Sequence, residues 1–205
     1  AVECRRCVLS ITPASDQLPY HENFEVHRRR VAEIAEAMAP AGIRVGLRFQ
    51  AAPNLRKDRT FQFIHDLDAT TLLISMSGAK NVGLVLDVWD WTVSGLPVEK
   101  VRSLSPEQIV AVQVADLPSN VPPAEASEEK RLLPGEGGGI DIATFLRILA
   151  EIGYDGPVTP IPYRGLFGRT RRDTVARLAG EGLDKVWRAA GLPSDYRSSP
   201  AHAVA

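Results

Sequence analysis

Two acidic residues, Asp87 and Asp90, lie at and just after the end of an apolar run, where their carboxylates are candidates for chemistry. Asp87 ends the run 82–87, and Asp90 follows between Trp89 and Trp91. A carboxylate at the end of a buried strand either faces an open site, as a general acid or base, or is paired with a cation. Both alternatives stay open for Asp87. One of the two tryptophans is expected to cover a ligand, with a packed loop as the alternative.

Two more candidates lie in the Pro- and Gly-rich stretch 118–139. Arg131 has the planar fork that suits a phosphate or a carboxylate, although its Glu- and Lys-rich neighbours are also typical of a solvated face. Glu136 is flanked by glycines that let the backbone approach a ligand closely, and loop mobility explains these glycines as well. The triple glycine is not a phosphate loop, because no Lys-Ser/Thr follows it.

The elements that must position these residues alternate along the chain. Short apolar runs are expected to be strands covered on both faces, and the amphipathic stretches between them helices, as in βα units around a parallel sheet. Polar stretches after strands, at 13–22 and 118–139, are expected to be irregular and to form the active face. The expected strands are 7–11, 43–49, 82–87, 109–114 and 156–159, and the expected helices are 24–39, 61–76, 141–152 and 173–190.

Length and composition predict one domain, residues 1–193, followed by a flexible C-terminal tail at 194–205. The net charge of -1 gives no reason to expect nucleic acid or an anionic membrane as a partner. Without a membrane-length apolar run or a signal peptide, a cytoplasmic protein is expected. The only C-x-x-C, Cys4 and Cys7, lacks a second cysteine pair, which favours two small residues at the entry to a strand over a zinc site or a redox pair.

Five strands do not close an eight-stranded barrel, and three βα units, each of roughly 30 residues, are expected to be missing at the N-terminus. An open arc of strands exposes apolar edges. The chain is therefore expected to begin partway through a barrel, or to form a homo- or hetero-oligomer in which another chain supplies or covers the missing strands.

Several segments share their sequence with one family. The segment NVGLVLDVWDWTVSG at 81–95 resembles a strand and loop of the sugar phosphate isomerase/epimerase family, the xylose isomerase-like TIM barrels. Segments at 45–49, 109–116, 131–137 and 152–160 agree with the family in the same order. The resemblance covers essentially the whole chain and implies an α/β fold, a (β/α)8 TIM barrel of which about five βα units are present.

The resemblance also implies a metal site, which this chain departs from. The family holds a divalent cation such as Mn, Mg or Zn with a Glu, an Asp, a His and a second Glu, and its glutamates move a proton between adjacent sugar carbons. By position these ligands fall on Arg48, Asp87, Gln113 and Ile161. Only Asp87 is kept, so no metal cofactor is expected. Instead, Arg48 is expected to lie between Asp87 and Asp90 and neutralise them.

Three functions follow as hypotheses. The first is a sugar or sugar-phosphate isomerase or epimerase with a reduced proton-transfer apparatus. The second is a pseudoenzyme that still recognises a small sugar or an anion, and the third is a structural subunit. Loss of both glutamates favours the last two, because losing a base typically lowers a rate by about 100- to 10,000-fold. The candidate catalytic residues are Asp87, Asp90 and Glu136, and the candidate substrate-binding residues are Arg48, Trp89, Trp91, Gln113, Asp116 and Arg131, of which Asp116 is expected mainly to anchor the loop after it.

Overall fold

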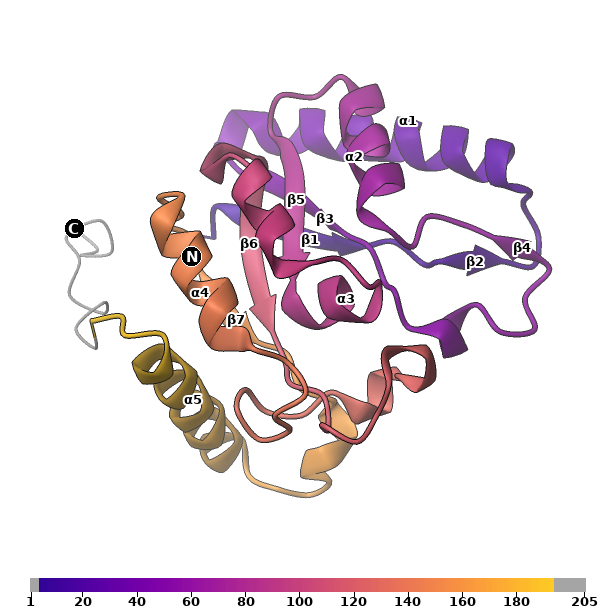
Figure 1. Ribbon diagram of the computed structural model, residues 1–205. Helices are drawn as coiled ribbons and strands as arrows, with labels where there is room; N and C mark the ends of the chain where they lie inside the picture. Colours follow the sequence, from indigo (N-terminus) through magenta and orange to yellow (C-terminus); the bar gives the residue numbers. More distant parts are fainter. Residues whose placement is uncertain (1–3, 194–205) are drawn as a thin grey trace.

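Five parallel strands form one curled sheet, an open part of a barrel, in the computed structural model of the chain (Figure 1). The structure describes residues 4–193. The strand order is β1-β3-β5-β6-β7, and a separate antiparallel pair joins β2 to β4. The bounds are β1 (Arg6–Ser10), β2 (Ala14–Ser15), β3 (Arg44–Arg48), β4 (Phe61–Gln62), β5 (Val82–Asp87), β6 (Ile109–Val114) and β7 (Val158–Pro160).

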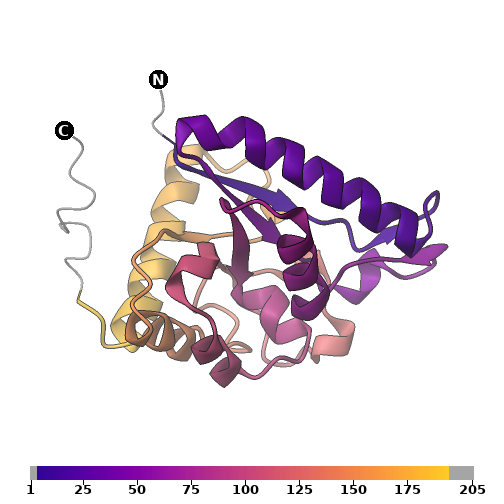
Figure 2. The same cartoon turned by 90° about the horizontal axis from the view of Figure 1, so that it is seen from above.

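Helices pack against the outer face of this sheet. α1 and α2 lie side by side over β3 and β5, whereas α4 and α5 pack together at the β6–β7 end (Figures 1 and 2). None of the helices within residues 4–193 is long and apolar enough to cross a membrane. Their bounds are α1 (Tyr20–Met38), α2 (Leu67–Ser77), α3 (Val88–Val93), α4 (Ile142–Glu151) and α5 (Arg172–Ala189).

Glycines on the inner face of the sheet allow neighbouring strands to approach closely. A Cβ atom on Gly46 would lie 2.5 Å from Cγ2 of Val85, and one on Gly83 would lie 2.6 Å from the carbonyl oxygen of Gln108. The strands can therefore curl tightly here only because these positions have no side chain. Side chains alternate between the two faces of a strand, so Arg48 and Asp87 follow on the inner face, at the carboxyl ends of β3 and β5.

The expected alternation of strands and helices is confirmed. The strands 82–87 and 109–114 have the predicted bounds, and the other three differ by one or two residues at their ends. Helix α4 begins after Asp141, whose carboxylate accepts a hydrogen bond from the amide of Thr144 at 3.0 Å. Cys4 and Cys7 lie just before and within β1, both as free thiols. The predicted tail at 194–205 lies outside the described residues.

Two predictions about local structure were wrong in part. Residues 61–62 form β4, and α2 begins only after Asp66, whose carboxylate accepts a hydrogen bond from the amide of Ala69 at 2.8 Å. This cap fixes the start of the helix six residues later than expected. Within 13–22, residues 14–15 pair with β4, and α1 begins at Tyr20, so the stretch is less irregular than predicted.

Candidate functional site

A buried cluster of arginines and carboxylates lies at the carboxyl ends of the strands; we call Arg48, Asp87, Asp90, Glu128 and Arg131 the ion network. Nε of Arg48 lies 3.0 Å from Oδ2 of Asp87 and 2.9 Å from Oδ2 of Asp90, and its Nη2 lies 2.7 Å from the latter oxygen. The predicted position of Arg48 between the two aspartates is therefore confirmed.

Arg131 reaches the same two aspartates from the loop after β6. Its Nη1 donates to Oδ2 of Asp87 at 2.9 Å, and its Nη2 donates to Oδ2 of Asp90 at 2.7 Å. The guanidinium also stacks on the ring of Trp89, 4.2 Å from the ring centroid. With an exposed fraction of 2%, Arg131 is a buried structural cation rather than part of a solvated face.

Glu128 is the member of the network that the sequence analysis missed. Its Oε2 lies 2.8 Å from Nε of Arg131, and its Oε1 lies 3.6 Å from Nη2 of Arg48. The spacing of three between Glu128 and Arg131 is a signal for such a pair, but it was hidden in a run of charged residues that is typical of a surface.

Local structure explains why Asp87 and Asp90 come together. Asp87 is the N-cap of α3, and its Oδ1 accepts hydrogen bonds from the amides of Trp89 and Asp90, each at 3.0 Å. The chain therefore turns into a helix immediately after β5. Asp90 then lies one turn along, where its Oδ1 accepts a hydrogen bond from the amide of Ala51 at 2.8 Å.

Burial and charge act differently on the two aspartates. Burial opposes ionisation of Asp87, but the guanidinium groups of Arg131 and Arg48 outweigh it and lower the pKa of Asp87 below its ordinary value. Burial and the Asp87 carboxylate raise the pKa of Asp90 to about 6, although Arg131 and Arg48 oppose this change. The network has three carboxylates and two guanidinium groups, so a single proton on Asp90 makes it neutral.

The tryptophans do not cover a ligand site. Trp89 and Trp91 belong to α3 and each has an exposed fraction of 0%. Nε1 of Trp91 donates to the carbonyl oxygen of Pro97 at 3.1 Å, and its ring packs edge-on against Phe145. Because the segment is helical and not an extended loop, both rings are buried, which is the packing alternative.

Asp116 has the anchoring role expected for it. Its carboxylate accepts hydrogen bonds from four backbone amides, those of Leu117, Gly137, Gly138 and Ile140, at 2.8 to 3.2 Å. The carboxylate therefore holds both ends of the loop 117–140 together. Glu136 lies in this loop with an exposed side chain, and within residues 4–193 it forms no ion pair with the ion network.

The remaining positions decide how well the site suits a metal ion. Gln113 lies beside Asp87 in the register of β5 and β6, and its buried Oε1 has no hydrogen-bond partner among the described residues. Ile161 follows β7 and has no metal-binding atom in its side chain. Within residues 4–193 no three His, Cys, Asp or Glu side chains are arranged to hold a metal ion. With two guanidinium groups among the carboxylates, the residues present do not fit a divalent cation.

The fold and the strand-end site together define a class of protein, the TIM barrels related to sugar isomerases. A family model described as xylose isomerase-like TIM barrel matches residues 1–183, and the chain belongs to this family. It is 24% identical over 156 residues to an inosose isomerase of Bacillus velezensis, covering 76% of this chain and 52% of the relative. It is 32% identical over 129 residues to a 3-dehydroshikimate dehydratase of Pseudomonas aeruginosa, covering 62% and 19%.

Solved structures show the same fold. A xylose isomerase domain protein from Alicyclobacillus acidocaldarius has a TM-score of 0.80 at 31% identity, over 91% of this chain and 65% of that chain. The IOLI protein, solved with a bound zinc atom, has a TM-score of 0.74 at 20% identity, over 91% and 64%. The chain thus spans about half the length of the inosose isomerase and about two thirds of these structures, and a solved relative binds a divalent metal.

Proposed function

We propose that this chain is a non-catalytic member of the sugar isomerase and epimerase family, a barrel that binds a small polyol or anion without isomerising it. The observation that supports this proposal is the burial of Asp87 and Asp90, with exposed fractions of 2% and 0%, against two arginines. A base must come within hydrogen-bond reach of the proton that it removes. Neither carboxylate is free to reach a substrate.

The proposal predicts a protein without metal-dependent turnover. The purified protein should contain no stoichiometric divalent metal by elemental analysis. With added Mn2+, it should also catalyse no exchange of the carbon-bound hydrogens of inosose or 3-dehydroshikimate for deuterium from D2O. These are the compounds named in its relatives, and the exchange can be followed by NMR. A matched variant with Arg48→Glu, Gln113→His and Ile161→Glu should bind the metal. Metal-dependent exchange by the unchanged protein would refute the proposal.

The edges of the sheet favour a second candidate, a structural subunit. β1 pairs only with β3 among the described residues, and Val8, opposite Gly46 in the register, has an exposed fraction of 39%. An uncovered strand edge is a surface for pairing with another chain. We therefore propose that a second polypeptide covers this edge.

This candidate predicts an assembly that depends on β1. Light scattering after size exclusion should give a mass above the 22.3 kDa of the chain, and Val8→Lys should reduce it to that of a monomer, because a lysine on an edge strand blocks pairing. Leu72→Lys, at an exposed position on α2, is the control and should leave the mass unchanged. A monomeric unchanged protein would exclude self-association, and purification without any companion chain would then exclude the subunit role.

A further inference from the structure

The segment 161–172, which connects β7 to α5, has a strongly positive charge. It contains four arginines and no acidic residue, whereas the whole chain has a net charge of -1. The side chains of all four are exposed: Arg164, Arg169, Arg171 and Arg172. Within residues 4–193 only one of the four forms an ion pair, Arg171, whose Nε lies 3.4 Å from Oδ1 of Asp173. The positive charge is therefore concentrated on one stretch of the surface and is largely not neutralised there.

Two apolar side chains are exposed among these arginines. The exposed fraction is 38% for Tyr163 and 47% for Leu166. Tyr163 is the N-cap of a short 3-10 helix, Arg164–Phe167, and its carbonyl oxygen accepts a hydrogen bond from the amide of Leu166 at 3.1 Å. Exposed apolar side chains that lie together are typical of a surface that contacts a protein or a membrane.

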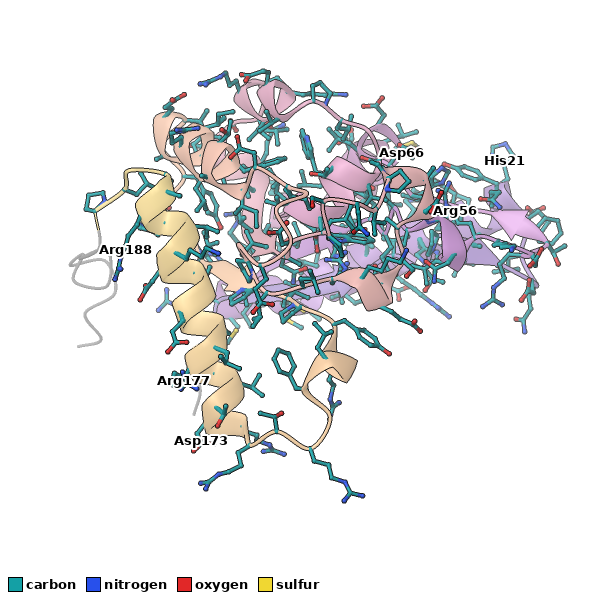
Figure 3. The ribbon with its side chains drawn as sticks, turned by 60° about the horizontal axis from the view of Figure 1, so that its bottom comes forward. His21, Arg56, Asp66, Asp173, Arg177 and Arg188 are labelled. Atoms are coloured by element: carbon teal, nitrogen blue, oxygen red, sulfur yellow. The ribbon has the colours of Figure 1, made fainter. Side chains whose placement is uncertain are left out.

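The backbone holds this turn against the rest of the molecule. The amide of Tyr163 donates to the carbonyl oxygen of Arg131 at 2.8 Å. A Cβ atom on Gly165 would lie 2.2 Å from Cε1 of Tyr163, so the tyrosine ring lies across the backbone at a position that only glycine allows. Figure 3 shows that the loop before Asp173 protrudes from the body of the molecule.

We infer that segment 161–172 is a docking surface for a membrane that contains anionic phospholipids. The arginines bind the phosphate and carboxylate groups of the lipids, and Leu166 and Tyr163 enter the boundary between head groups and acyl chains. The net charge of the chain gave no reason to expect such a partner, because it averages over acidic residues elsewhere. The inference goes beyond the proposed function and does not depend on it.

The shape and chemistry of the segment favour a bilayer over other anionic partners. A protruding loop cannot enclose a peptide, whereas a bilayer is a broad surface that such a loop can enter. A single-stranded nucleic acid would gain from the arginines and from stacking on Tyr163, but it offers nothing to an aliphatic side chain such as Leu166. Only a lipid surface uses both kinds of exposed side chain.

Sedimentation of the purified chain with lipid vesicles tests the charge. The chain should bind vesicles of phosphatidylcholine with one quarter phosphatidylserine, and it should not bind phosphatidylcholine alone. Arg169→Ala with Arg172→Ala should weaken binding roughly 25-fold, because each arginine near an anionic surface contributes roughly fivefold. Arg177→Ala with Arg188→Ala is the control, since it removes the same charge from two exposed positions further along α5 (Figure 3). Its effect should be less than about threefold.

Salt separates the apolar contribution from the charge. Leu166→Ser should weaken binding roughly tenfold, by the same factor in 0.1 M and in 0.5 M NaCl. The effect of the Arg169 and Arg172 changes should shrink in 0.5 M NaCl, because the Debye length falls from about 10 Å to about 4 Å. Leu72→Ser, at an exposed leucine on α2, is the control and should leave binding unchanged.

Several results would overturn the inference. Binding to anionic vesicles that is absent, equal to binding to phosphatidylcholine alone, or no weaker in the loop variants than in their controls would each do so. Binding of oligo(dT) or polyglutamate without binding of vesicles would assign the surface to a nucleic acid or to an acidic polypeptide instead. Arg169→Gln with Arg172→Gln, which keeps most of the side-chain volume, replaces the alanine pair if that pair folds poorly. The proposed function is tested separately, by metal content and hydrogen exchange.

Discussion

Replacing Arg131 by alanine is expected to lower the free energy of unfolding by about 3–5 kcal/mol, the usual cost of removing one partner from a buried ion pair. The change leaves Asp87, Asp90 and Glu128 with only Arg48 to neutralise them. It also removes the guanidinium that stacks on Trp89. The cost arises mainly because the carboxylates of Asp87 and Asp90, with exposed fractions of 2% and 0%, cannot be hydrated in place of the lost contacts.

Urea denaturation followed by circular dichroism would measure this change, with Arg177→Ala as the control. Arg177 lies on α5 with its side chain on the outside of the molecule (Figure 3) and pairs with Glu181 at 2.7 Å. Both partners of that pair are more than half exposed, so its loss should cost less than about 0.5 kcal/mol. A loss below about 1 kcal/mol for Arg131→Ala would show that the ion network is not a unit of stability.

The sequence predicted strand boundaries best where a continuous apolar run forms a fully buried strand. The strands 82–87 and 109–114 were predicted with their observed bounds because both are continuous apolar runs, and a strand covered on both faces has no polar side to blur its limits. The boundary of α2 was missed because residues 61–66 are as apolar as the helix itself. Only the capping hydrogen bond of Asp66 separates the two.

Within the site, the position of Arg48 between the two aspartates was predicted, whereas the helical conformation of residues 88–93 was not. The resemblance to the family places Arg48 at a strand end near two aspartates, and its opposite charge makes them its expected partners. The helix after Asp87 depends instead on how one carboxylate orients toward two amides. The pairing of Arg131 with Asp87 and the place of Glu128 in the network were not predicted, because a loop brings both residues to the site from more than 40 residues beyond Asp87, and no local pattern contains such contacts.

The free energy of unfolding is expected to fall as rising pH removes the proton from Asp90. Its pKa is about 6 in the folded chain, against 3.8 as the ordinary value. A group whose pKa is raised on folding stabilises the protein when protonated, and this stabilisation is lost as the pH rises through the folded pKa. At about 1.4 kcal/mol per pH unit, the two values correspond to a total of about 3 kcal/mol, most of which is lost between pH 4 and pH 7. Asp87 acts below this window, since its lowered pKa affects stability only under more acidic conditions.

Asp90→Asn isolates this effect, because asparagine does not ionise. Subtracting its free energy of unfolding from that of the unchanged protein, at each pH from 4.5 to 7, cancels the histidines and the surface carboxylates that the two proteins share. The difference should fall with rising pH, by a total of about 2 kcal/mol over this window. Asparagine also alters the hydrogen bonds to Arg48, Arg131 and Ala51, but that cost is constant with pH and does not change the slope. A flat difference would mean that Asp90 is ionised throughout, and that the two arginines outweigh both its burial and its repulsion by Asp87.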